Sequence, residues 1–168
     1  MNHKQISSLC VLFGVALYLF WHSSSTAKAE PLPKELHPAD KLIRSNAKMI
    51  GFFALPTYTY VDIGYHTWRK MEKGGFELSY TLEFEGPVTV KMAFYLDSDG
   101  SMKYLKVVRE NAYWNPFTDA VGSSQLKTLR KIVHTHPGVK QDVDLIKQAD
   151  SANAQDLCIL YLQLEQKK

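Results

Sequence analysis

The feature that most constrains the fold of this chain is a run in which apolar and polar side chains strictly alternate. The run extends from Phe76 to Phe84, and glutamate, serine and threonine fill the positions between its apolar residues. A period of two places every apolar side chain on one face of a β-strand and leaves the other face to water. The run therefore predicts a half-buried strand.

Two further strands follow along the chain. Val88–Leu96 continues the alternation after a glycine–proline pair. Asp97–Gly100 is typical of a tight turn, in which glycine adopts a positive φ without steric cost. Tyr104–Val108 then returns as a third strand. The three segments predict an antiparallel meander.

Segments with helical spacing flank these strands. In Asp40–Leu55 apolar residues recur every three or four positions, which predicts a helix. Thr59–Lys73 predicts a second helix that ends at two glycines, and Asn115–His136 predicts a third. Val139–Gln155 is polar and predicts either a loop or a short helix.

The last element, Asp156–Glu165, is apolar on both alternating sides. This pattern predicts a strand at the centre of the sheet, and a C-terminal helix is the alternative because leucine-rich runs are ambiguous by period. The predicted fold class is α+β, with an antiparallel three- to four-stranded sheet and helices packed on one face.

The N-terminal residues resemble a targeting segment. Residues 1–29 combine a positive start, an apolar run over residues 6–21 and the small-x-small triplet Ala27-Lys28-Ala29. The run is shorter than the roughly 20 residues of a spanning helix, which favours cleavage after Ala29. An uncleaved inner-membrane anchor is the alternative. Both predict a periplasmic or secreted body, with a linker at 30–38 and a domain at 39–168.

Charge and cysteine content exclude some classes of function. Removal of Lys4 and Lys28 with the targeting segment reduces the 20 basic residues to 18, against 17 acidic residues. This balance leaves no basic stripe, so we expect no nucleic-acid partner. Cys158 would be the one cysteine of the mature chain, which rules out an internal disulfide.

Candidate chemical groups are sparse. His134 and His136 could supply two metal ligands, but a zinc site needs three or four. The aspartates before Gly100 do not have the spacing of a calcium-binding EF-hand loop. Glu83 and Glu85 could form a carboxylate pair on one strand face, and no nucleophile motif accompanies them. We expect no catalytic residue, metal or cofactor.

Several short motifs resemble one family. Leu82–Lys91, the Asp99–Met102 turn and Val107-Val108 resemble the opening hairpin of TonB and TolA C-terminal domains. Asn115–Val121 resembles the step into the helix of that family, and Cys158–Leu164 its last strand. The resemblance implies a non-enzymatic periplasmic domain that binds an envelope protein by accepting a strand at the edge of its sheet.

If this resemblance holds, the last strand faces the partner. Its predicted partner-binding residues are Cys158, Leu160, Leu162 and Leu164. Tyr113 and Trp114 are further candidates, because aromatic side chains in a loop often contact partners. An edge role conflicts with the prediction of a central strand, unless a partner or a second copy covers it.

Two other functions fit the same pattern. A secreted cystatin-like or nuclear-transport-factor-like domain would bind a small ligand in a pocket lined by the first two helices and by Phe76, Leu78 and Tyr80. A closed apolar cavity above about 300 Å³ would favour this alternative. A hydrolase without a recognisable motif is the third.

Overall fold

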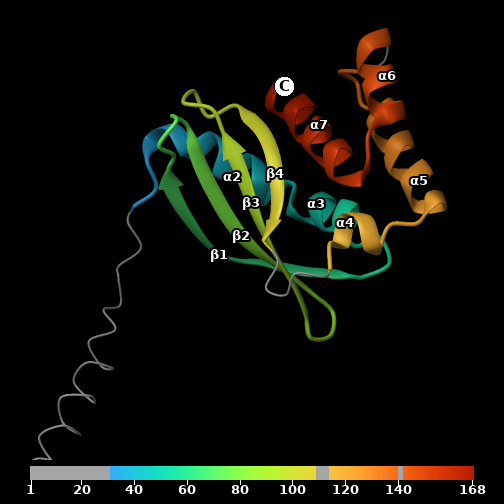
Figure 1. The fold of residues 1–168 in the computed structure, drawn as a ribbon, viewed down its shortest axis with the longest axis horizontal. Coiled ribbons are helices and arrows are strands. Elements are labelled where there is room, and N and C mark those ends of the chain that lie inside the picture. The colour runs from blue at the N-terminus through green and yellow to red at the C-terminus, as the bar shows by residue number, and fades with distance from the viewer. Residues whose placement is uncertain (1–30, 109–113, 140–141) are drawn as a thin grey trace, which may run out of the picture. The chain divides into compact units, whose positions relative to one another are not determined.

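The computed structural model describes residues 31–108, 114–139 and 142–168 of the chain. They form an α+β domain in which helices pack against a four-stranded antiparallel sheet (Figure 1). The strand order β1-β2-β3-β4 follows the sequence, so each strand pairs with the next. The predicted fold class is confirmed, and the predicted targeting segment, residues 1–29, lies outside the described residues.

The meander contains one strand more than the three predicted. The strands are β1 (Tyr60–Lys70), β2 (Phe76–Phe84), β3 (Val88–Leu96) and β4 (Met102–Val108). The predictions for β2, β3 and β4 are confirmed. The helix predicted at Thr59–Lys73 is wrong, because most of this segment forms β1.

Irregular pairing explains why β1 did not look like a strand in the sequence. Its register with β2 shifts between Tyr60 and Asp62 and again between Ile63 and His66. Each such irregularity displaces the alternation of side chains by a residue, so the period of two is lost. The aromatic and β-branched residues of the segment suit a strand even so.

The helices divide more finely than the sequence predicts. A short 3-10 helix, η1 (Lys34–Leu36), lies within the predicted linker, and its Leu36 is buried. The remaining helices are α2 (His37–Ser45), α3 (Ala47–Ala54), α4 (Pro116–Asp119), α5 (Ser123–His134), α6 (Val143–Ser151) and α7 (Ala154–Gln166). The predicted first and third helices are each divided in two, and the ambiguous polar segment contains α6.

The last element is a helix. The Asn153 side chain accepts a hydrogen bond from the backbone N–H of Asp156 at 2.9 Å, which caps the start of α7. Leucines are buried on several sides of α7 because it packs against α2, α3, α5 and β4. A helix that is apolar nearly all round has the same continuous apolar sequence pattern as a central strand. The strand prediction for Asp156–Glu165 is therefore wrong, and the helix alternative is correct.

A polar contact joins α2 to the sheet inside the core. The hydroxyl of Tyr80 donates to Asp40 Oδ1 at 2.6 Å, and Arg44 Nε donates to the same oxygen at 3.0 Å. Burial, together with the neighbouring Asp40 carboxylate, raises the pKa of Tyr80 above its ordinary value. The hydroxyl therefore stays protonated and acts as a donor, so this buried polar group has a hydrogen-bond partner.

Glutamines of α7 cover the outer edge of β4. Gln155 Nε2 donates to the carbonyl of Leu105 at 2.5 Å, and Gln163 Nε2 donates to the carbonyl of Met102 at 2.9 Å. Gln166 accepts from the Met102 N–H at 3.1 Å. Side-chain amides thus satisfy backbone groups that an edge strand would otherwise expose.

The turn between β1 and β2 offers a test of close packing. Gly74 and Gly75 both have positive φ, of 85° and 80°. A Cβ on Gly75 would lie 2.3 Å from the Leu96 carbonyl oxygen, whereas a Cβ on Gly74 would meet nothing within 4 Å. We expect Gly74→Ala to lower the free energy of unfolding by about 1–2 kcal/mol through backbone strain alone, and Gly75→Ala to lower it further. Urea unfolding of both variants measures the difference, and equal losses would contradict the close approach.

Candidate functional site

A row of side chains crosses all four strands near one end of the sheet. Arg69 of β1 pairs in register with Glu77, which pairs with Tyr95, which pairs with Tyr104 of β4. Since residues that pair across strands share a face, the four side chains lie on the same face of the sheet. Leu78, the neighbour of Glu77, is fully buried on the opposite, helix-covered face. We call these four residues the cross-strand row.

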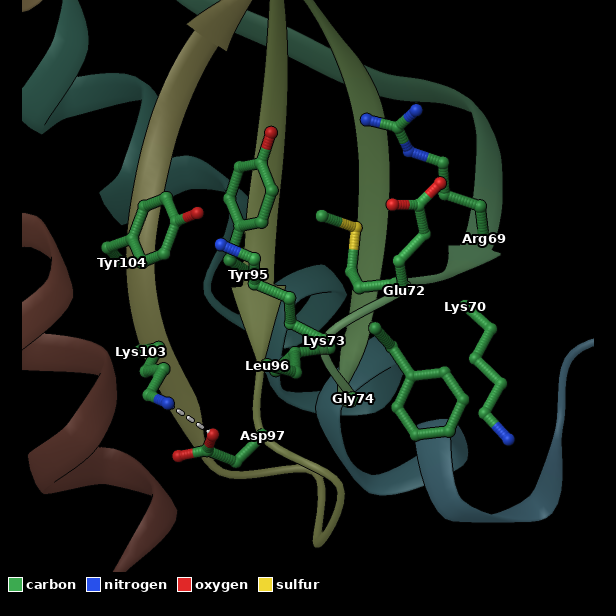
Figure 2. A pocket seen from close by; sticks show the side chains of 12 residues that line it. Arg69, Lys70, Glu72, Lys73, Gly74, Tyr95, Leu96, Asp97, Lys103 and Tyr104 are labelled. Atoms are coloured by element: carbon green, nitrogen blue, oxygen red, sulfur yellow. Dashed lines mark ion pairs between the residues drawn. The ribbon is translucent and has the colours of Figure 1, made fainter.

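Direct contacts connect neighbours within the row. Arg69 Nη2 donates to Glu77 Oε2 at 2.6 Å. The rings of Tyr95 and Tyr104 stack with centroids 4.2 Å apart and planes inclined by 10°. Figure 2 shows the two rings side by side on adjacent strands. Tyr104 remains 50% exposed, so the stack offers an aromatic surface to a partner.

The electrostatics of the row centre on Glu77. Partial burial acts to raise the pKa of Glu77, but hydrogen bonds from Arg69 and Tyr95 outweigh it and hold the pKa below its usual value. Burial and the same carboxylate raise the pKa of Tyr95. At neutral pH Glu77 is therefore ionised and Tyr95 is a hydrogen-bond donor.

A hollow of about 500 Å³ adjoins the row, and it is lined by residues at the ends of β1, β3 and β4 and by the β1–β2 turn (Figure 2). Its charged lining residues are the basic Arg69, Lys70, Lys73 and Lys103 and the acidic Glu72 and Asp97. Lys103 Nζ lies 2.5 Å from Asp97 Oδ1. Phe76, Leu96 and the stacked tyrosines add apolar surface. The hollow is open to solvent, so its chemistry suits binding at a surface.

Glu83 and Glu85, weighed in the sequence as a possible carboxylate pair, do not lie in the same element. β2 ends at Phe84, and Glu85 lies in the turn beyond it.

His134 and His136, weighed in the sequence as possible metal ligands, face different carboxylates. His134 Nε2 lies 3.2 Å from Asp150 Oδ1, outside hydrogen-bond geometry. His136 is buried, and its Nδ1 accepts from the Gly138 N–H at 3.1 Å. Its Nε2 therefore carries the proton and donates to Glu165 Oε1 at 2.8 Å. In the described parts of the chain, no three His, Cys, Asp or Glu residues converge as metal ligands.

The predicted partner-binding residues of the last element are buried. Cys158, Leu160, Leu162 and Leu164 are between 0% and 5% exposed within α7. Burial also raises the pKa of the Cys158 thiol, which keeps it protonated. Strand addition by Cys158–Leu164 is wrong, because this segment is a helix inside the core. Trp114 is 43% exposed, and Tyr113 lies outside the described residues.

The residues predicted to line a small-ligand pocket lie in different environments. Leu78 and Tyr80 are at most 1% exposed and fill the core, whereas Phe76 lines the open hollow. Sequence reasoning missed the hollow because it assigned Arg69, Lys70 and Lys73 to a helix. Once β1 is recognised as a strand, its register with β2 brings Arg69 beside Glu77.

Comparisons with protein-family models, with curated proteins and with solved structures find no match to this chain. Across residues 31–108, 114–139 and 142–168, no helix is both long enough and apolar enough to cross a membrane. The candidate site therefore stands on its own geometry, as the cross-strand row and the adjoining hollow.

We expect Glu77→Gln to make stability less sensitive to acid. The pKa of Glu77 in the folded chain is below its usual 4.5, so the unfolded chain binds the proton more tightly. The stabilisation from Glu77 is complete above pH 4.5 and disappears as the pH falls through the lower folded value. Unfolding free energies measured between neutral and acidic pH should fall less steeply in the variant than in the parent chain.

Glu83→Gln is the matched control for this measurement, because Glu83 is an exposed residue on the same face of the same strand. This variant should keep the acid dependence of the parent chain. If both substitutions flatten the curve equally, the contacts of Glu77 with Arg69 and Tyr95 do not have the role assigned to them.

Proposed function

We propose that the chain is an exported, non-enzymatic domain that binds an envelope protein by strand addition at the outer edge of β1. The proposal keeps the class of partner implied by the resemblance to TonB and TolA C-terminal domains, and it moves the binding edge from Cys158–Leu164 to Tyr60–Lys70. The observation that carries it is the difference between the two edges of the sheet.

The β4 edge is already occupied. Three glutamines of α7 hydrogen-bond to backbone groups of Gly100, Met102 and Leu105. An added strand would have to displace these side chains and leave the glutamine amides without partners. We therefore exclude β4 as the accepting edge.

The β1 edge has backbone groups oriented for an added strand. In the described sheet β1 pairs with one strand, β2. The Met71 N–H donates to the Gly75 carbonyl at 3.0 Å, and hydrogen-bonded pairs alternate along an antiparallel ladder. Arg69 therefore exchanges hydrogen bonds with Glu77, and the N–H and C=O of Lys70 face away from β2. These are the groups that a partner strand would bond.

The irregular half of β1 limits which strands can add. The register shifts lie between Tyr60 and His66, whereas Thr67–Lys70 pairs regularly with β2. Bulges and charged side chains are common means of keeping an edge strand from pairing indiscriminately. The regular stretch Thr67–Lys70 is short and contains the basic residues Arg69 and Lys70. It therefore favours pairing with one matched partner strand over general aggregation.

The small-ligand alternative would use the hollow. Its volume of about 500 Å³ falls within the range of small-molecule sites, but such sites enclose most of their ligand. The hollow is open along the strand ends, which supports a polypeptide contact more than an enclosed ligand.

Site-specific crosslinking in cells that produce the full chain tests the proposal. Thr67 and Lys106 occupy opposite ends of one cross-strand register line, on β1 and β4, and both are exposed. A photo-crosslinking residue at position 67 should capture an envelope protein, and one at position 106 should not. Equal capture from both positions would contradict strand addition at β1.

Substitution of Lys70 separates backbone pairing from charge in the same assay. Lys70→Pro removes the outward N–H, which an edge strand tolerates, and should abolish the adduct formed from position 67. Lys70→Ala keeps the N–H and should retain much of the adduct. An adduct unaffected by Lys70→Pro would show that the partner does not bond to the backbone of β1.

A further inference from the structure

A groove of about 410 Å³ lies between the outer edge of β4 and the helices α6 and α7 (Figure 1). Its polar lining includes Gln148, Ser151, Gln155, Asp156 and Gln163. We call it the amide groove. We infer that it binds an uncharged oligosaccharide, one of whose sugar rings stacks on Tyr104. This inference goes beyond the proposed function and does not rest on it, because β4 and β1 are opposite edges of the described sheet.

Tyr104 supplies an aromatic face to the amide groove. Tyr95 stacks on one face of the Tyr104 ring, with centroids 4.2 Å apart and planes inclined by 10°. Because β4 is the last strand of the described sheet, the other ring face is directed away from β3, toward the edge that the groove follows. Tyr104 is 50% exposed, so this face is open. The C–H groups on one side of a pyranose ring form a flat apolar surface that packs on such a face.

The glutamines of α7 supply hydrogen-bond acceptors to the amide groove. Gln155, Ile159 and Gln163 follow one another at a spacing of one helical turn, so they share one side of α7. The Nε2 groups of the two glutamines donate to carbonyls of β4, at 2.5 and 2.9 Å. In the described part of the chain no donor reaches Oε1 of either residue, and both side chains are partly exposed. The amides are thus held in place by β4, and their oxygens remain available to accept from sugar hydroxyls.

The charges of the amide groove favour a neutral ligand. Its charged lining residues are Lys103 and Asp156, and Lys103 is paired with Asp97. Neither sign of charge is therefore in excess. A sugar offers many hydroxyls, each both donor and acceptor, and these match a lining of amides, a carboxylate and a serine hydroxyl. A peptide strand fits less well, because the glutamines already occupy the backbone groups of β4 that it would bond.

The test measures binding of cellotriose and of tri-N-acetylchitotriose to the full chain, in micelles of a detergent that has no sugar headgroup. Both probes have β-linked rings with equatorial substituents, which leaves a flat C–H face on each ring. Sorbitol, which has hydroxyls and no ring, is the control ligand. We expect at least one of the oligosaccharides to bind and sorbitol not to bind. Titrations followed by NMR of the ligand protons give the dissociation constants.

Substitutions of Tyr104 test the stacking contact. Tyr104→Ala should weaken binding about fivefold, the scale of one aromatic contact, and Tyr104→Phe should retain binding because it keeps the ring face. Tyr58→Ala is the matched control, because Tyr58 is 46% exposed and lies outside the lining of the groove. This variant should bind the oligosaccharide as the parent chain does.

Two further variants separate the amide groove from the hollow at the strand ends, because Tyr104 lines both. Gln148 lines the groove and not the hollow, and Lys73 lines the hollow and not the groove. Gln148→Ala should weaken binding about threefold, the scale of one exposed hydrogen bond, and Lys73→Ala should leave binding unchanged. Both side chains are exposed, so neither substitution disturbs the core.

The inference is overturned if neither oligosaccharide binds, if sorbitol binds equally well, or if Tyr104→Ala and Tyr58→Ala have the same effect. Weaker binding in Lys73→Ala with unchanged binding in Gln148→Ala would also overturn it, because the sugar would then lie in the hollow. The proposed function is read separately from the adduct at position 67 on β1, so either result can fail without the other.

Discussion

The packing of α7 against the sheet is the contact on which the rest of the structure depends. The apolar face of the sheet must be covered: α7 packs against β4 and against α2 and α3, and α3 packs against β1. The buried leucines of α7 join the same core as the apolar residues of β2 and β3. The same helix directs Gln155, Gln163 and Gln166 at the backbone of β4. One element therefore closes both the core and one edge of the sheet, and within residues 31–108, 114–139 and 142–168 no helix side chain is seen to hydrogen-bond to the backbone of β1 in the same way.

The two faces of the sheet also differ. One face of the sheet is filled by apolar packing, while the other displays the cross-strand row, whose aromatic stack and ion pair hold its side chains in place. The hollow lies at one end of that face, lined by the ends of β1, β3 and β4 and by the β1–β2 turn. The aromatic stack lies on β3 and β4, whereas the outward backbone groups that an added strand would bond lie at the β1 edge, separated from the stack by β2.

The errors of sequence interpretation have two physical causes. In β1, two irregularities of pairing displace the alternation of side chains, and the residues that remain happen to recur at helical spacing. In α7, burial on several sides removes the polar face by which an amphipathic helix is recognised. The second error moved the predicted binding residues to a buried helix. The first concealed Arg69, Lys70 and Lys73, which form much of the candidate site.

The sequence by itself determined the three regular strands and their turns. Alternation in β2 and β3 and a glycine of positive φ at position 100 are local properties, set by the burial of one strand face and by the sterics of one residue. Only the tertiary structure decided that Tyr60–Lys70 is a strand, that Ala154–Gln166 is a helix, and which sheet edge stays open. These features depend on what a segment packs against: pairing with β2 determines β1, and the surrounding core determines α7.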